Sequence, residues 1–203
     1  MATTSAEIEI FTGLPAPAPP RPRVLLVGAA LASGSAAMVL LTLVAIYIRL
    51  RSDVIASGDT WVPEGGVIQL TSGNMGMITL IMSAVTVAWF VYSLRNDDRI
   101  HAYLAAGLSI LLGVAYIPTV VYGWQQLGLG AADSPQALMI FAITGLHVAM
   151  VGVGLLFVGV MGFRALGGQL TGRAAEGASA AALFWYVTVA AYAVVWYAIT
   201  ITK

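Results

Sequence analysis

The chain has 203 residues, 60% of them hydrophobic and only 9% charged, and its nine Lys and Arg balance its nine Asp and Glu. This composition, with a mean hydropathy of +0.91, is typical of a membrane protein. A net charge of zero gives no indication of a nucleic-acid partner. The absence of cysteine excludes disulfides, iron–sulfur clusters and thiolate metal sites.

Residues 1–23 form a Pro-rich N-terminal tail, which we expect on the cytoplasmic side. Acidic Glu7 and Glu9, with no apolar core before Val24, argue against a signal peptide. The proline run between Pro15 and Pro22 favours an extended, polyproline-like conformation. Both an arm laid along a partner and a disordered tail fit this pattern.

Five long apolar stretches follow, at residues 24–48, 75–94, 101–124, 137–163 and 180–202. A helix rises about 1.5 Å per residue, so about 20 apolar residues cross a hydrocarbon core of about 30 Å. Each stretch is long enough. The sequence therefore predicts an all-α fold, a polytopic membrane protein whose five transmembrane helices form one domain over residues 24–203.

The basic residues predict the orientation of this bundle, because cytoplasmic loops carry an excess of Lys and Arg. With the N-terminus inside, six basic residues are cytoplasmic and three, Arg49, Arg51 and Lys203, lie outside. We therefore expect a multi-pass membrane protein with a cytoplasmic N-terminus and an outer C-terminus. The longest loop, residues 50–74, then faces outward, and its Trp61 and Pro63 suggest a short ordered cap.

Two spans carry faces of small residues, which allow helix backbones to approach closely in lipid. Gly145, Ala149 and Gly152 share one face of the fourth span, at the spacing i, i+4, i+7. The first span has a similar set, Ala29, Ala30, Ser33, Ala36 and Ala37. Such faces fit docking of another subunit, and they also fit packing within the chain.

His147 is the one ionisable residue deep inside a span. The other histidine, His101, lies at the inner end of the third span, roughly 15–20 Å away along the membrane normal, so the two cannot ligate one haem. We interpret His147 as a neutral imidazole that is hydrogen-bonded within the bundle, and expect no cofactor or metal in this chain. Pro118 is expected to kink the third span.

Three segments resemble subunit III of the haem–copper (cytochrome c) oxidases, in the five-span form found in many bacteria. The run Thr144–Val148 (Thr-Gly-Leu-His-Val) is similar to the family's His-Gly-Leu-His-Val motif. Trp185 and Trp196 match the terminal helix, and residues 113–116 match a Gly-Gln-Ala motif. Six family polar positions are changed, at Gly34–Ser35, Val114, Ile117, Thr144, Tyr186 and Val189. The auxiliary polar network of the family is thus largely missing.

The resemblance implies an accessory subunit without a redox centre, which packs on subunit I of an aerobic terminal oxidase and contacts lipid. Haem and copper would then lie in subunits I and II, and the complex would reduce oxygen to water with proton pumping. The resemblance also implies a bacterial plasma-membrane location and bound phospholipid. An accessory or assembly subunit of another membrane complex, and a small transporter, are the alternatives. The residues expected in helix packing and subunit contact are Gly145, His147, Ala149, Gly152, Trp185 and Trp196.

Overall fold

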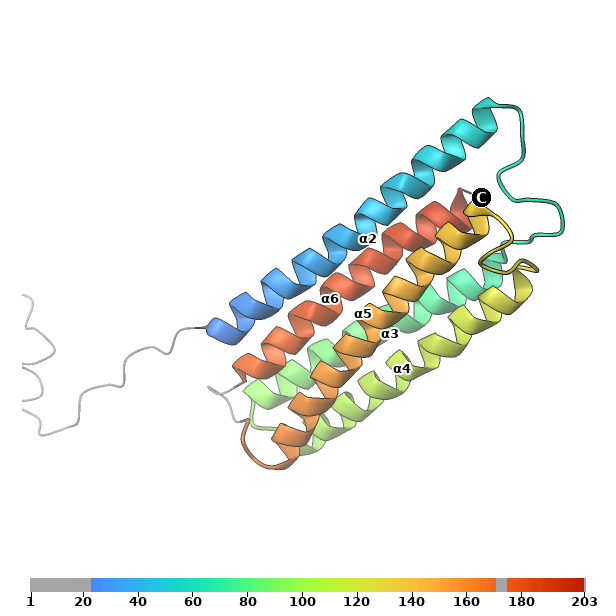
Figure 1. The fold of residues 1–203 in the computed structure, drawn as a ribbon. Helices are drawn as coiled ribbons and strands as arrows, with labels where there is room; N and C mark the ends of the chain where they lie inside the picture. The colour runs from blue at the N-terminus through green and yellow to red at the C-terminus, as the bar shows by residue number, and fades with distance from the viewer. Residues whose placement is uncertain (1–22, 171–174, 203) are drawn as a thin grey trace, which may run out of the picture.

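The computed structural model describes residues 23–170 and 175–202, which form a bundle of long helices (Figure 1). The Pro-rich tail before Arg23 lies outside these residues. The elements are α2 (Val24–Ala56), α3 (Leu70–Arg95), α4 (Arg99–Gln126), α5 (Pro135–Leu166) and α6 (Glu176–Val195), and α6 continues into a π-helix, η2 (Trp196–Ile201). Five of these helical segments are long and apolar enough to cross a membrane. The predicted all-α fold with five transmembrane helices is confirmed.

The helices extend beyond the apolar stretches on which the prediction was based. Helix α2 continues eight residues past Ile48, to Ala56, and α3 begins at Leu70, so the loop between them is residues 57–69 and not 50–74. Backbone hydrogen bonds continue a helix wherever the residues tolerate it, whatever their hydropathy. At the end of α2 the Arg49 Nε donates to Asp53 Oδ2 over 3.1 Å, one turn later, which supports these extra turns.

Helix α6 is the most enclosed helix of the bundle and α2 the least. Helix α6 packs against α2, α3 and α5, whereas α2 packs mainly on α6 and α5 at one edge (Figure 1). The small residues Ala29 and Ser33 of α2 are buried, on the same stripe as Leu40, Val44 and Tyr47. The small-residue face of the first span therefore packs, at least in part, within the chain.

The loop after α2 is fastened to the bundle through Trp61. This side chain is buried, and its Nε1 donates to the Tyr47 hydroxyl over 2.9 Å. The two rings meet edge to face at 4.9 Å between centroids. Further along, the Val67 N–H donates to the Leu127 carbonyl. These contacts agree with the ordered cap expected from Trp61 and Pro63.

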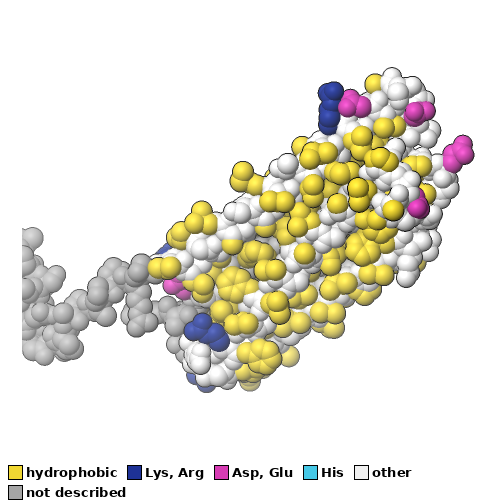
Figure 2. Space-filling model, in the orientation of Figure 1, with side chains coloured by type: hydrophobic (Ala, Val, Ile, Leu, Met, Phe, Trp, Pro, Cys, Tyr) yellow, Lys and Arg dark blue, Asp and Glu magenta, His cyan; other side chains and the backbone are white. Residues whose placement is uncertain are grey.

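Charged side chains gather at the two ends of the bundle, and the belt between them is apolar (Figure 2). Among the described residues, one end holds four arginines, Arg23, Arg95, Arg99 and Arg164, and the other holds two, Arg49 and Arg51. Many large apolar side chains of the belt are exposed, as expected of a surface covered by lipid or by another subunit. Helix α4 continues through Pro118, whose side chain lies on the outside.

Candidate functional site

His147 lies in the centre of the bundle and is fully buried. Its Nε2 is 3.0 Å from the Thr188 carbonyl oxygen, and its Nδ1 is 2.9 Å from the Tyr116 hydroxyl. A carbonyl only accepts, so Nε2 carries the hydrogen, and Nδ1 accepts the hydroxyl proton of Tyr116. Both ring nitrogens are therefore engaged in hydrogen bonds within the bundle, and the neutral state of the ring stays a prediction.

Two tyrosines complete a cluster of three rings around His147. Tyr116 and Tyr192 lie 5.4 Å and 5.0 Å from the imidazole between centroids, and 5.2 Å from each other. The Tyr192 hydroxyl donates to the Gly73 carbonyl over 3.2 Å. Gly76 makes room for it, because a Cβ there would stand 2.6 Å from the Tyr192 hydroxyl oxygen. The cluster thus joins α3, α4, α5 and α6.

Trp185 of α6 forms a second junction of the same four helices. Its ring is almost fully buried, and Nε1 donates to Ser83 Oγ of α3 over 3.0 Å. A Cβ at Gly113 of α4 would stand 2.7 Å from Trp185 Cη2, and a Cβ at Gly154 of α5 would stand 2.7 Å from Trp185 Cε3. The indole therefore fits between two glycines, and the contacts of Trp185 are internal.

Two more tryptophans make hydrogen bonds between helices near the opposite end from Arg23. Trp196 Nε1 donates to Asn74 Oδ1 over 2.9 Å, and this joins η2 to α3. Trp124 Nε1 donates to Thr144 Oγ1 over 2.8 Å, and this joins α4 to α5. In a membrane, unpaired polar groups are costly, so these bonds hold the helices in register.

Gly145, Ala149 and Gly152 lie elsewhere, on the outer face of α5. Ala149 is exposed, and a Cβ added at Gly145 or at Gly152 would meet nothing within 4 Å outside its own helix. The six residues singled out from the sequence therefore form two groups. His147, Trp185 and Trp196 join helices inside the bundle, while the three small residues face away from it.

The interior partners could not be identified from the sequence. Tyr116 lies in the family-like segment 113–116, but the residue pattern does not pair Tyr116 or Tyr192 with His147, or Ser83 with Trp185. Each of the three is a polar group inside an apolar span, where it needs a partner. Among residues 23–170 and 175–202, no three His, Cys, Asp or Glu side chains lie close enough together to hold a metal ion. The contacts described around His147 and Trp185 are hydrogen bonds and close packing.

Comparison with known proteins gives the family. The family model described as Cytochrome c oxidase subunit III matches residues 23–202. The "Probable cytochrome c oxidase subunit 3" of Rickettsia conorii is 30% identical over 111 residues, which are 54% of this chain and 39% of that protein. The subunits 3 of Xenopus laevis and Gallus gallus are 29% and 30% identical over 132 residues, 64% of this chain and 49% and 50% of theirs.

The matched part of the chain therefore spans half or less of the length of these curated relatives. The family model, in contrast, takes in all five helices. This multi-pass membrane protein accordingly belongs to the cytochrome c oxidase subunit III family.

Proposed function

We propose that this chain is an accessory subunit of an aerobic terminal oxidase of the cytochrome c oxidase type, packed on the catalytic subunit I. The complex would reduce oxygen to water and pump protons, with its haems and copper in subunits I and II. Membership of the subunit III family supports this assignment. The chain's own part would be to stabilise its partner.

The state of His147 supports a role without a redox centre. A haem ligand needs a free nitrogen lone pair directed at the iron. Here the Nδ1 lone pair accepts from Tyr116, and Nε2 donates to Thr188. His101, the other histidine, lies at the bundle end, where its Nδ1 is 2.7 Å from Asp98 Oδ2. Both histidines are thus engaged in contacts within the chain.

The observation that carries the docking proposal is the outer face of α5. Along it, Gly145, Gly152 and Gly159 recur every seven residues, and none has a neighbour within 4 Å of an added Cβ. Ala149, Leu156 and Phe163 follow each glycine by four residues. We call these six residues the α5 outer stripe. A seven-residue repeat suits a partner helix that winds around α5 in a left-handed supercoil.

Copurification tests the proposal. The tagged chain, isolated from its native membrane in mild detergent, should comigrate with a large complex that has haem absorption. Gly152→Leu puts a bulky side chain into the stripe and should release the chain from that complex. Gly107→Leu is the matched control, because Gly107 of α4 is exposed and equally free of neighbours. A chain that runs alone without haem would refute the oxidase assignment, and unchanged copurification of Gly152→Leu would refute docking through the stripe.

We also propose a bacterial plasma-membrane location with the N-terminal end of α2 in the cytoplasm. The excess of arginine at that end of the described bundle supports this orientation. The chain has no cysteine, so a maleimide can label only the one cysteine that is introduced into it. Asp133→Cys should react with a membrane-impermeant maleimide in intact cells, and Asp97→Cys should react only after the cells are broken. The reverse labelling would overturn the orientation.

A further inference from the structure

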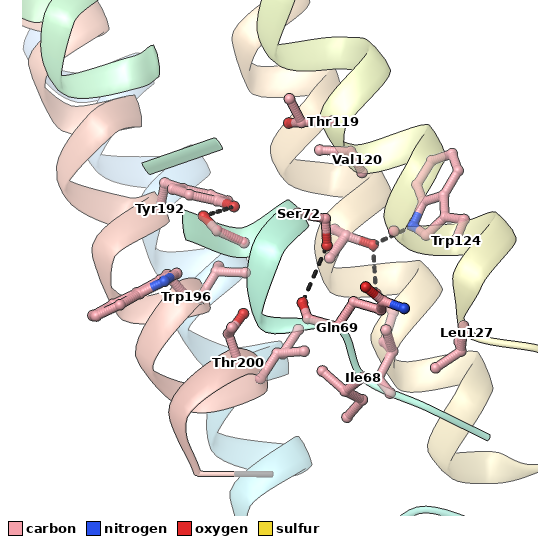
Figure 3. Close-up of a pocket in the computed structure, with 16 residues that line it drawn as sticks. Ile68, Gln69, Ser72, Thr119, Val120, Trp124, Leu127, Tyr192, Trp196 and Thr200 are labelled. Atoms are coloured by element: carbon pink, nitrogen blue, oxygen red, sulfur yellow. Dashed lines mark hydrogen bonds between the residues drawn. The ribbon is translucent and has the colours of Figure 1, made fainter. Parts of the chain in front are cut away.

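A pocket lies between the helices at the bundle end near Trp196, where α3 begins and α4 ends (Figure 3). Its volume is about 70 Å³, and its wall comes from α3, α4, α5, α6 and η2. No residue of α2 lines it. The hydroxyls of Ser72, Thr144 and Thr200 lie on the wall beside the rings of Trp124 and Trp196. We call this cavity the hydroxyl pocket.

The Thr200 hydroxyl is the polar group of this pocket that lacks a partner. Thr200 is 6% exposed. Its hydroxyl makes no hydrogen bond with another described residue, but the oxygen is not fully enclosed, since Arg51 Nε is the one enclosed side-chain nitrogen or oxygen without a partner among the described residues. Thr200 lies against Gly73, where a Cβ would stand 2.5 Å from Thr200 Oγ1. A hydroxyl can donate one hydrogen bond and accept two. A molecule in the pocket can therefore bond this oxygen without displacing a contact within the described chain.

Two further hydroxyls retain capacity for a ligand. Ser72 Oγ donates to the Gln69 carbonyl over 3.2 Å and has both lone pairs left, and Thr144 Oγ1 uses one lone pair for Trp124. Ser72 and Thr200 project from α3 and η2, and Trp124 and Trp196 stand on opposite sides of the close-up (Figure 3). The wall therefore offers hydrogen bonds together with apolar rings.

The volume of the pocket and its uncharged lining limit the kind of molecule that can bind there. The residues that line the pocket include no Asp, Glu, Lys, Arg or His, so a charged ligand would be buried without a counter-charge. A cavity of about 150 Å³ accommodates benzene, so 70 Å³ fits a smaller molecule. The π-helix adds to the case, because such segments are rare and often occur at functional sites.

We infer that the hydroxyl pocket binds a small uncharged amphiphile, a hydroxyl group on an apolar stem of two or three carbons. The hydroxyl bonds Thr200 and Ser72, and the stem packs against Trp124 and Trp196. None of the residues that line this pocket belongs to the α5 outer stripe.

The test uses the full-length purified chain in detergent, with 2-bromoethanol as the probe, because its bromine quenches nearby tryptophan fluorescence. Quenching of the intact chain should contain a saturable part, since two of its five tryptophans line the pocket. Thr200→Val keeps the shape of the side chain and removes the hydroxyl. It should weaken the saturable part about fivefold, the factor for one lost net hydrogen bond. Bromoethane, which lacks the hydroxyl, should give only linear quenching.

Thr42→Val is the matched control, because Thr42 is an exposed threonine of α2 outside the pocket. It should behave like the unchanged chain. Ser72→Ala should also weaken the saturable quenching. It replaces Thr200→Val as the test if Thr200→Val loses its helical circular dichroism. Linear quenching by 2-bromoethanol in the unchanged chain, as for a pocket that holds only water, would overturn the inference. Equal saturation in the unchanged chain, Thr200→Val and Ser72→Ala would overturn it as well.

Discussion

Replacing Gly154 by alanine should destabilise the bundle, because it drives a methyl group into Trp185. The new Cβ would stand 2.7 Å from Trp185 Cε3 and 3.0 Å from Cζ3, whereas ordinary contacts begin at 3.4 Å. The closest pair is thus short by 0.7 Å (3.4 minus 2.7). One of the two groups must move by that amount.

The indole has little freedom to move away. On its other edge, Trp185 Cη2 lies where a Cβ of Gly113 would be 2.7 Å distant, and Nε1 is tied to Ser83 over 3.0 Å. Overpacking a core by one methyl group costs about 1–3 kcal/mol. Because the ring is rigid and held on both sides, we expect Gly154→Ala to cost about 2 kcal/mol, in the middle of that range.

Gly159→Ala in the same helix is the control, since its Cβ would meet nothing within 4 Å. In the isolated full-length chain it should be neutral, or gain up to about 1 kcal/mol from alanine's higher helix propensity. The assay is reversible unfolding in mixed detergent micelles, followed by circular dichroism and tryptophan fluorescence. If Gly154→Ala proves as stable as Gly159→Ala, Trp185 is not clamped between α4 and α5 as described.

The remaining predictions concern the hydrogen bonds between helices. His147→Ala should lower the free energy of unfolding by about 2–4 kcal/mol in the same assay, because it leaves a cavity and an unpaired Tyr116 hydroxyl. Any haem spectrum of the copurified complex should stay unchanged. A lost haem band would contradict the assignment of His147 to packing. Trp196→Phe and Asn74→Ala should each lower the free energy of unfolding by about 1 kcal/mol. The double variant should lose less than the sum of the two, since both substitutions break the same hydrogen bond. Additive costs in that double-mutant cycle would show that the bond contributes nothing.

The number and type of the helices could be predicted because the bilayer fixes the length of an apolar span. Their ends could not be placed as well, because hydropathy marks where lipid is and backbone bonding decides where a helix stops. The extra turns of α2 after Ile48 carry Arg49, Arg51 and Asp53, which belong in a helix outside the hydrocarbon core. The change to a π-helix at Trp196 had no signal in the residue pattern.

The hydrogen-bond partners of the predicted residues could not be predicted, for a different reason. His147 bonds Tyr116, 31 residues earlier, and Thr188, 41 residues later, so its environment depends on the register of three helices. Periodicity within a single helix contains no information on that register. The same limit applies to small residues, which suit either kind of contact: Ala29 and Ser33 are buried in the chain, whereas Gly145 and Gly152 face outward.

Helix α5 has both kinds of contact surface, because one face packs inside the bundle and the opposite face points outward. The inner face, with Ile143, His147, Val151 and Gly154, is buried and holds the bundle together. The outer stripe, with Gly145 and Gly152, makes no contact within the described chain that an added methyl group would disturb. Substitutions on the two faces should therefore separate: inner ones lower the stability of the chain alone, and outer ones weaken only its association. A helix that behaved otherwise, with Gly152→Leu unfolding the isolated chain, would have its outer face in use within the bundle.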